Sequence, residues 1–331
     1  MPIAIVVHGG AGTISADRIE IAQAGCKEAA LIGWRILQEG GSALDAVEAA
    51  VRALEDNPNY NAGTGSSFTA NGSIEMDAGL MEGYTLQVGG VAAVERIKNP
   101  ISLARRVLES PHVLLSGRGA QEFALEQGLT LCKQEDLITE RQYNNWQRIR
   151  EEQRAAIQAE YGDEPTIHRR EVSSIPARIE REQDITPLNS SIPNREEKHG
   201  TVGAVAIGYS GRLAAATSTG GMPNKYPGRI GDSPLAGSGF YADENAAISC
   251  TGHGEDFIRL LIAKRAADGV ARGMSAREAA EAAIATLGAK AEGTGGLIIV
   301  DRFANVGFSW NSHNMAYAYI AQDMAEPVAG V

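Results

Sequence analysis

The stretch that decides the fold is residues 199–206, His199-Gly200-Thr201-Val202-Gly203-Ala204-Val205-Ala206. Residues 202–207 are an uninterrupted apolar run of strand length, and we expect them to form a buried strand. Thr201 is the first residue of this strand and directly follows Gly200. A cut between these two residues would therefore place Thr201 at a new amino terminus.

A threonine hydroxyl is a weak nucleophile at neutral pH because it holds its proton tightly, so it needs an adjacent base. A free α-amine, with a pKa of roughly 7.7–8.0, is such a base and belongs to the same residue. In the intact chain this nitrogen is an amide, so we expect an inactive precursor. Gly200 lacks a Cβ atom, which permits the bent peptide in which the Thr201 hydroxyl attacks the Gly200 carbonyl. The sequence predicts self-cleavage into residues 1–200 and 201–331.

The segment before the cleavage point has a different composition. From about residue 139 to residue 198, Glu, Arg, Gln, Asn and Ser dominate, and Pro165, Pro176, Pro187 and Pro193 interrupt the run. Such a stretch cannot bury enough apolar surface to offset the entropy lost on ordering. We expect a helix to about Glu160 and a flexible linker over about 160–199.

The remaining strand signals occur in pairs. Residues 3–7 read as a strand that ends in a glycine turn at 9–12, and Asn71-Gly72 predicts a type I′ hairpin turn. Residues 213–217 read as a strand that forms a hairpin with 202–207, and residues 297–300 and 305–308 read as a final hairpin. Paired strands with helices grouped between them favour antiparallel sheets covered by helices.

Capping boxes mark two helix starts, at Ser42-Ala43-Leu44-Asp45 and at Ser275-Ala276-Arg277-Glu278. Residues 256–272 are expected to form one long helix.

Composition excludes several classes of function. With 30 Lys and Arg against 41 Asp and Glu, the formal net charge is −11, which argues against nucleic acid or an anionic membrane as a partner. The three cysteines, Cys26, Cys132 and Cys250, are far apart and indicate neither a disulfide framework nor a zinc ribbon. Neither a signal peptide nor an apolar stretch of membrane-spanning length is evident. We expect a cytoplasmic protein.

Further motifs occur in a fixed order along the chain. They are His8-Gly9-Gly10-Ala11-Gly12, Asn61-Ala62-Gly63 with Gly65, Met76-Asp77-Ala78, Ala216-Thr217-Ser218-Thr219-Gly220-Gly221, Pro227-Gly228-Arg229-Ile230-Gly231-Asp232-Ser233-Pro234, Ser249-Cys250-Thr251-Gly252 and Gly295-Gly296-Leu297. With residues 199–206, they make the sequence resemble the plant-type L-asparaginases or isoaspartyl peptidases (β-aspartyl-peptidases). These are threonine-type members of the N-terminal nucleophile (Ntn) hydrolase superfamily.

The resemblance implies an α+β fold, a four-layer αββα sandwich of two mainly antiparallel sheets flanked by helices. It also implies that residues 1–331 form a single domain, cleaved into an α subunit (1–200) and a β subunit (201–331). Two such αβ pairs would associate into a heterotetramer.

The resemblance also carries chemical roles to individual residues. It makes Thr201 the nucleophile and Thr219 the residue that hydrogen-bonds and tunes its hydroxyl. Thr251 and the Gly252 N–H would form the oxyanion hole, where a glycine lets the main chain approach the developing charge.

Substrate binding is assigned in the same way. Arg229 would bind the substrate α-carboxylate and Asp232 the α-ammonium, because a zwitterionic head group needs one cation and one anion close together. The other positions implied in the binding loops are Ile230, Gly231, Thr251, Gly252, His253 and Gly254. His253 follows the oxyanion glycine and would influence the shape or polarity of the pocket.

No organic cofactor is implied. The family carries a structural sodium ion bound mostly by main-chain carbonyls. The matching positions are Leu54, Glu55, Asn57, Tyr60, Ala62 and Thr64.

The expected function is hydrolysis of L-asparagine to L-aspartate and ammonia, together with cleavage of β-aspartyl dipeptides. The alternatives are a relative that acts on glycosylated asparagine, an endopeptidase of the same superfamily, and an uncleaved scaffold without activity. A glycine-rich nucleotide binder is more remote, since GxGxxG spacing is absent. In the scaffold alternative, Arg229 and Asp232 would be a surface ion pair and Thr219 and Thr251 would only satisfy backbone groups.

Overall fold

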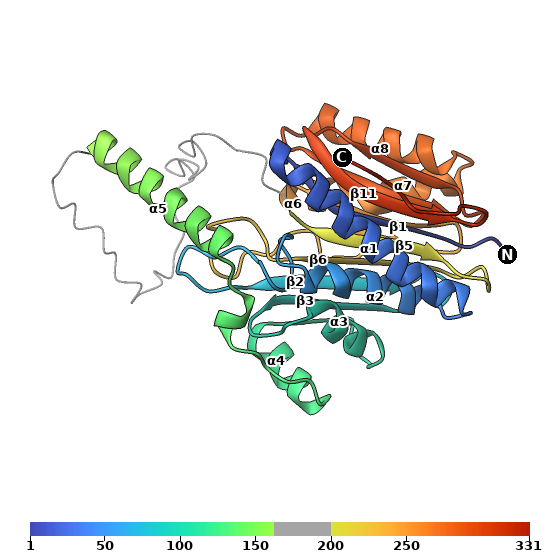
Figure 1. Cartoon of the computed structure of the whole chain (residues 1–331), viewed down its shortest axis with the longest axis horizontal. Helices are drawn as coiled ribbons and strands as arrows, with labels where there is room; N and C mark the ends of the chain where they lie inside the picture. The colour runs from blue at the N-terminus through green and yellow to red at the C-terminus, as the bar shows by residue number, and fades with distance from the viewer. Residues whose placement is uncertain (162–199) are drawn as a thin grey trace, which may run out of the picture.

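The computed structural model describes residues 1–161 and 200–331, which fold into two β-sheets packed face to face between two layers of helices (Figure 1). The large sheet contains, in spatial order, β12 (Val328–Gly330), β11 (Asn314–Ala321), β1 (Ala4–Gly12), β5 (Val202–Ile207), β6 (Leu213–Thr219), β2 (Met76–Glu82), β3 (Val88–Val94) and β4 (Leu114–Ser116). The small sheet contains β10 (Val306–Trp310), β9 (Gly295–Asp301), β8 (Ala246–Gly252) and β7 (Phe240–Ala242). Every pairing between these strands is antiparallel except that of β3 with β4.

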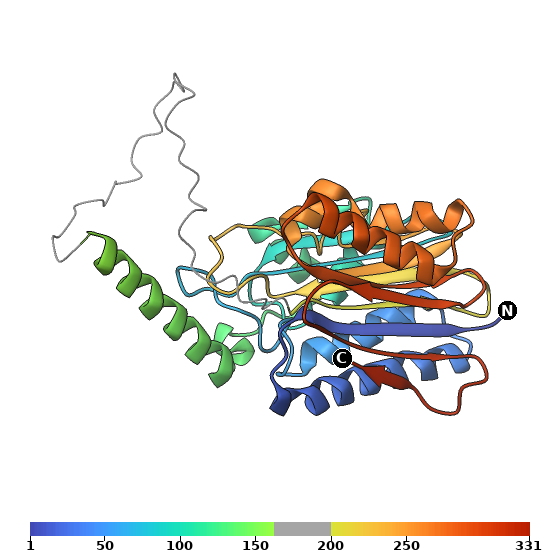
Figure 2. The ribbon, with the colours of Figure 1, turned by 90° about the horizontal axis from the view of Figure 1, so that it is seen from above.

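Helices cover the outer face of each sheet. The large sheet packs against α1 (Ile19–Gln38), α2 (Ala43–Asp56), α3 (Pro100–Leu108) and α4 (Gly117–Glu126), and the small sheet packs against α7 (Ile262–Ala271) and α8 (Ala276–Lys290). Figure 2 shows the blue and the orange helices on opposite sides of the strands. The predicted αββα sandwich is confirmed.

Alternation along the strands explains why their sequences are apolar almost throughout. In β1, Ile5 and Val7 face the core under α1 and α2, whereas Ala4 and Val6 face the small sheet. A strand buried on both faces needs apolar residues at nearly every position. This requirement is why residues 202–207 and 213–216 were recognisable as strands in the sequence.

Both capping boxes are confirmed as helix starts. The Ser42 hydroxyl accepts a hydrogen bond from the Asp45 N–H at 3.1 Å. At α8, the Ser275 hydroxyl accepts from the Glu278 N–H at 3.3 Å, and the Glu278 carboxylate accepts from the Ser275 N–H at 2.9 Å. These side chains satisfy N–H groups that have no partner inside the helix.

The prediction of a turn at residues 9–12 is wrong, because these glycines continue β1. Ala11 and Gly12 pair with Met315 and Asn314 of β11 after a register shift that follows His8. Gly10 has a φ of 109°, which a residue with a side chain rarely adopts. The glycines therefore build a bulge inside the strand and do not end it.

The hairpin predicted around Asn71-Gly72 is also wrong. Of these two residues only Gly72 has a positive φ, so the type I′ geometry is not present. The Thr69 N–H bonds the Ser73 carbonyl at 2.9 Å in a tight turn, and Thr69 forms an isolated bridge with Lys225. Tertiary pairing with a distant loop has replaced the local hairpin.

Two expectations for the second half need correction. The expected single helix over 256–272 is two helices, α6 (Gly254–Leu260) and α7, separated by Leu261 in the left-handed conformation with a φ of 51°. The hairpin of β9 and β10 is present, but it is not the last element, since β11 and β12 follow it.

The helix expected to reach about Glu160 is α5 (Glu140–Tyr161), which Figures 1 and 2 show extending away from the sandwich. Trp146 stacks on Phe68 with ring centroids 5.2 Å apart and donates its indole N–H to the Thr69 carbonyl at 3.0 Å. The flexible linker predicted over about 160–199 lies, from residue 162 on, outside the described residues. In the part of the chain that the structure describes, no helix has both the length and the apolar character needed to cross a bilayer.

Candidate active site

The layer between the two sheets is apolar over most of its area but polar at one end. Alternate positions of β6 run from Leu213 and Ala215, which are apolar, to Thr217 and Thr219, which are polar. All of these side chains are buried. The candidate site lies at this polar end, where the start of β5 meets the end of β6.

The predicted nucleophile and its predicted partner are in contact. Thr201 Oγ1 donates a hydrogen bond to Thr219 Oγ1 over 3.2 Å, and the Gly221 N–H donates to the same Thr219 oxygen over 3.0 Å. Both threonine side chains are buried. Because Thr219 accepts both bonds, its own hydroxyl hydrogen can turn toward Thr201 when Thr201 loses its proton.

Gly200 lies against Asn61. A Cβ atom on residue 200 would lie 2.6 Å from the Asn61 Cβ, so the space next to the cleavage point excludes a side chain. The Asn61 amide is held in place, since it donates to the Gly221 carbonyl at 2.6 Å and accepts from the Ser67 N–H at 2.8 Å. Asn61 belongs to the Asn61-Ala62-Gly63 motif, but the sequence alone gave no reason to place it beside residue 200.

A buried polar network aligns the two sheets at this end. His8 Nε2 lies 3.0 Å from Ser249 Oγ, and Ser249 Oγ lies 2.6 Å from Thr217 Oγ1. Burial lowers the pKa of His8 to about 3, despite a hydrogen bond with the Thr201 backbone that raises it, so the imidazole is neutral at pH 7. Thr219 follows Thr217 by two residues in β6, and Thr251 follows Ser249 by two residues in β8. The network therefore lies next to both predicted catalytic threonines. Sequence reasoning gave His8 and Ser249 no role, because their connection spans 241 positions.

The predicted oxyanion residues lie at the end of β8. Thr251 is fully buried, and its Oγ1 accepts a hydrogen bond from the Ala11 N–H at 3.2 Å. Ala11 comes directly after the bulge in β1, so the bulge delivers this N–H to Thr251. A Cβ atom at Gly252 would lie 2.6 Å from the Thr294 carbonyl oxygen and 2.7 Å from Gly295 Cα. Only glycine fits there, and a fixed N–H beside a fixed hydroxyl suits an oxyanion hole.

The loop that carries Arg229 and Asp232 rests on a buried ion pair. Lys225 Nζ lies 2.9 Å from Glu75 Oε2 and also donates to the Arg229 carbonyl at 2.8 Å. The same Glu75 oxygen accepts from the Gly228 N–H at 2.8 Å. These bonds fix the backbone on both sides of residue 228.

The two predicted substrate anchors are in different environments. The Arg229 guanidinium is paired with Glu255 through Nε–Oε1 and Nη2–Oε2 bonds of 2.8 and 2.6 Å. Burial raises the pKa of Glu255, but the hydrogen bonds and charge of Arg229 outweigh burial, so the pKa falls to about 2. Asp232 is 3% exposed, and its Oδ2 has no hydrogen-bond partner among the described residues. Glu255 was missed in the sequence, where it is only an acidic residue directly before the helix expected from residue 256.

Burial raises the pKa of the Asp232 carboxyl to about 7, although the nearby Arg229 charge lowers it. A buried carboxylate with an unpaired oxygen can bind a cation. The structure therefore places a buried carboxyl with an unpaired oxygen within the electrostatic influence of the Arg229 guanidinium.

The remaining predicted positions line the same region. Cβ atoms on Gly231 and Gly254 would lie 3.0 and 2.9 Å from Arg229 Nη1 and Nη2, so both glycines make room for the guanidinium. Ile230 is exposed. His253 Nδ1 lies 2.9 Å from Asp256 Oδ2, so one side of this ring is turned toward α6.

The six positions matched to a sodium site lie in the last turn of α2, which holds Leu54 and Glu55, and in the loop that follows it. This loop folds back against the end of the helix. The Thr64 N–H bonds the Glu55 carbonyl at 2.8 Å. A Cβ atom on Gly63 would lie 2.5 Å from the Glu55 oxygen, and one on Gly65 would lie 2.7 Å from the carbonyl oxygens of both Pro58 and Tyr60. The glycines thus allow several carbonyl oxygens to crowd together, which fits a cation held by the main chain.

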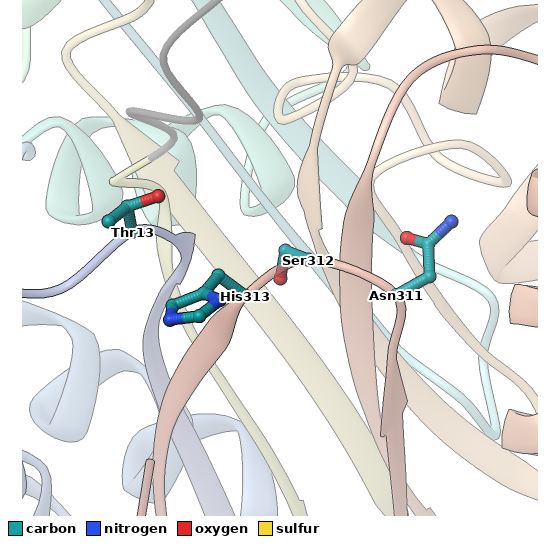
Figure 3. Close-up of a pocket in the computed structure, with 4 residues that line it drawn as sticks. All are labelled: Thr13, Asn311, Ser312 and His313. Atoms are coloured by element: carbon teal, nitrogen blue, oxygen red, sulfur yellow. The ribbon is translucent and has the colours of Figure 1, made fainter.

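An open pocket lies beside the site. It is lined by Thr13, Asn311, Ser312 and His313, and Figure 3 shows Thr13 and His313 next to each other. The register explains this proximity, since Gly12 pairs with Asn314. Thr13 is two residues beyond Ala11, the residue whose N–H bonds Thr251, so the pocket lies near the end of β1 that contacts Thr251.

The sequence is similar to known proteins along nearly its whole length. A family model described as "Asparaginase" matches residues 1–329. A plant-type L-asparaginase from Thermococcus kodakarensis is 47% identical over 332 residues, covering 99% of both chains, and one from Pyrococcus horikoshii is 44% identical over 333 residues, covering 99% of this chain and all of the relative. An isoaspartyl peptidase/L-asparaginase from Homo sapiens is 41% identical over 319 residues, covering 96% of this chain and 92% of the relative. The chain therefore belongs to this asparaginase family of hydrolases.

Proposed function

We propose that the chain cuts itself between Gly200 and Thr201, and that the mature enzyme hydrolyses L-asparagine and β-aspartyl dipeptides with Thr201 as nucleophile. The observation that carries the proposal is the buried hydrogen bond between Thr201 and Thr219 at the first residue of a strand. The names of the relatives, plant-type L-asparaginase and isoaspartyl peptidase/L-asparaginase, support the choice of substrates.

Self-cleavage would begin with attack of Thr201 Oγ1 on the Gly200 carbonyl carbon. The Gly200–Thr201 peptide bond breaks, its nitrogen takes up a proton, and Gly200 becomes linked to Thr201 through an ester. Water then hydrolyses the ester and releases the Gly200 carboxylate. The tight contact of Gly200 with Asn61 supports this step, because it limits the positions that the carbonyl can take.

Turnover would repeat the same chemistry on the substrate. The freed α-amine of Thr201 takes the hydroxyl proton as Oγ1 attacks the side-chain amide carbon, and it passes the proton to the departing ammonia or peptide amine. Thr251 and the Gly252 N–H stabilise the negative oxygen, and Thr219 donates its hydroxyl hydrogen to Thr201. Water attacks the resulting ester and L-aspartate leaves.

Arg229 would bind the α-carboxylate of the substrate and Asp232 its α-ammonium. Both substrates carry this free head group and a side-chain amide, so one site serves both. Asp232 must be ionised for this task, and the bound ammonium favours that form because it supplies the missing partner of Oδ2.

Three further properties complete the proposal. The carbonyl-rich loop of residues 54–64 would hold a sodium ion that stabilises the loop carrying Asn61. The α and β subunits would assemble as a dimer of αβ pairs. The location would be cytoplasmic, which agrees with cysteines that are all free.

The test compares the parent with Thr201→Ala. In the parent we expect two fragments on a denaturing gel, with threonine as the first residue of the smaller one, and ammonia release from L-asparagine. The variant should remain one chain and release no ammonia. A fragment that begins at another residue, or full activity in the uncleaved chain, would overturn the proposal.

A further inference from the structure

The side chain of Glu255 occupies one side of the Arg229 guanidinium. Its two oxygens accept from Nε and Nη2, at 2.8 and 2.6 Å. The Arg229 side chain is 16% exposed and that of Glu255 is 43% exposed, so solvent reaches the pair mainly on the Glu255 side.

A guanidinium is planar and offers two edges on which a carboxylate can bind with two hydrogen bonds. One edge is formed by Nε and Nη2, and the other by Nη1 and Nη2. Glu255 uses the first edge, so the second edge is still able to bind another carboxylate.

The backbone around Arg229 restricts the guanidinium further. Gly231 lies against Nη1 and Gly254 against Nη2, so closely that a Cβ atom on either residue would require movement. The Arg229 carbonyl is itself held by Lys225. Lys225 thus fixes the backbone of Arg229, Glu255 binds one edge of its guanidinium, and two glycines lie close to its terminal nitrogens.

From this geometry we propose that Glu255 is a positioning residue that sets substrate specificity, by holding the Nε and Nη2 edge of Arg229 so that the other edge faces the substrate α-carboxylate. The inference rests on the proposed function. It differs from a second interpretation of the same contact, in which Glu255 sits where the substrate carboxylate binds and must be displaced. The two interpretations predict opposite changes in affinity.

The experiment uses Glu255→Gln in the mature enzyme. The amide keeps the shape of the side chain but removes the charge and one acceptor. A matched control is Glu281→Gln, which removes the charge of an exposed carboxylate that pairs with Arg277 over 2.8 Å. Both variants are checked on a gel for complete self-cleavage.

Two measurements are made for each variant. The first is kcat and KM for L-asparagine. The second is the calorimetric Kd of L-aspartate and of β-alanine, which is L-aspartate without its α-carboxylate. The Glu255 variant should raise KM for L-asparagine and Kd for L-aspartate about tenfold, with kcat changed less than about threefold. Its Kd for β-alanine, and every value for the control, should stay within about twofold of the parent.

Two results would overturn the inference. Tighter binding of L-aspartate to the variant would mean that Glu255 occupies the position where the substrate α-carboxylate binds. Equal weakening of L-aspartate and β-alanine binding would mean a general structural effect. The binding comparison needs no turnover, so it tests Glu255 even if the parent releases no ammonia. A parent enzyme that releases no ammonia would count against the proposed function and not against the role of Glu255.

Discussion

The buried carboxyl of Asp232 makes the protein less stable as the pH rises. Replacing it with asparagine should abolish this effect. Burial raises the pKa of this carboxyl from its ordinary 3.8 to about 7. The folded state therefore holds the proton more tightly than the unfolded state does. Below pH 3.8 both states are protonated and the group has no effect. Between pH 4 and pH 7 the free energy of unfolding falls, and above pH 7 the loss is complete.

The magnitude follows from the two pKa values. Each tenfold change in proton affinity is worth about 1.4 kcal/mol, so a rise from 3.8 to about 7 corresponds to about 4 kcal/mol at pH 8. Asparagine has nearly the same shape and no charge to bury. We expect Asp232→Asn to stabilise the fold by up to about 4 kcal/mol at pH 8, which is about 8 °C in Tm at about 2 °C per kcal/mol.

The assay is thermal unfolding between pH 4 and pH 9 in a Thr201→Ala background, which keeps the chain in one piece. The stabilisation should be close to zero at pH 4 and should level off above pH 7. Asp268→Asn on α7 serves as the control, because this carboxylate is 39% exposed and is paired with Lys264. In the mature enzyme, Asp232→Asn should lower kcat/KM for L-asparagine about 10- to 100-fold, since a charged hydrogen bond of about 1.5–3 kcal/mol is lost. An Asp232→Asn protein that is less stable at pH 8, or equally stabilised at pH 4 and pH 8, would refute the reasoning.

The other predictions concern single contacts. Thr219→Val removes the hydroxyl that contacts Thr201, so kcat should fall about 10- to 100-fold while KM stays within about threefold, as steady-state kinetics can check. Gly252→Ala places a methyl group 2.6 Å from the Thr294 oxygen, and denaturant unfolding should show a loss of about 1–3 kcal/mol with a lower kcat; an unchanged variant would contradict the crowding. Leu261→Gly relieves the left-handed φ of 51° between α6 and α7 and should raise Tm by about 1–2 °C, whereas a lower Tm would show that packing of Leu261 outweighs the strain.

Local patterns in the sequence determined the positions of several strands and helix starts. The apolar runs at 202–207 and 213–217 predicted β5 and β6, and both helix caps were correct because a cap connects residues only three positions apart. The position of Thr201 at a strand start, directly after a glycine, was also visible without a structure. Such features depend on neighbours in the chain, which the sequence displays directly.

Tertiary structure alone decided how distant segments meet. The bond from Ala11 to Thr251 spans 240 positions, and the contact of His8 with Ser249 spans 241. The first depends on the bulge that follows His8 in β1, and the second on how the large sheet packs against the small one. A shift of one residue in the register of β1 would turn every side chain of the strand to the other face. The pairing of Arg229 with Glu255 likewise requires the loop after β6 to meet the start of α6. The sequence specifies which groups can react, but only packing between strands and loops far apart in the chain brings those groups within hydrogen-bonding distance.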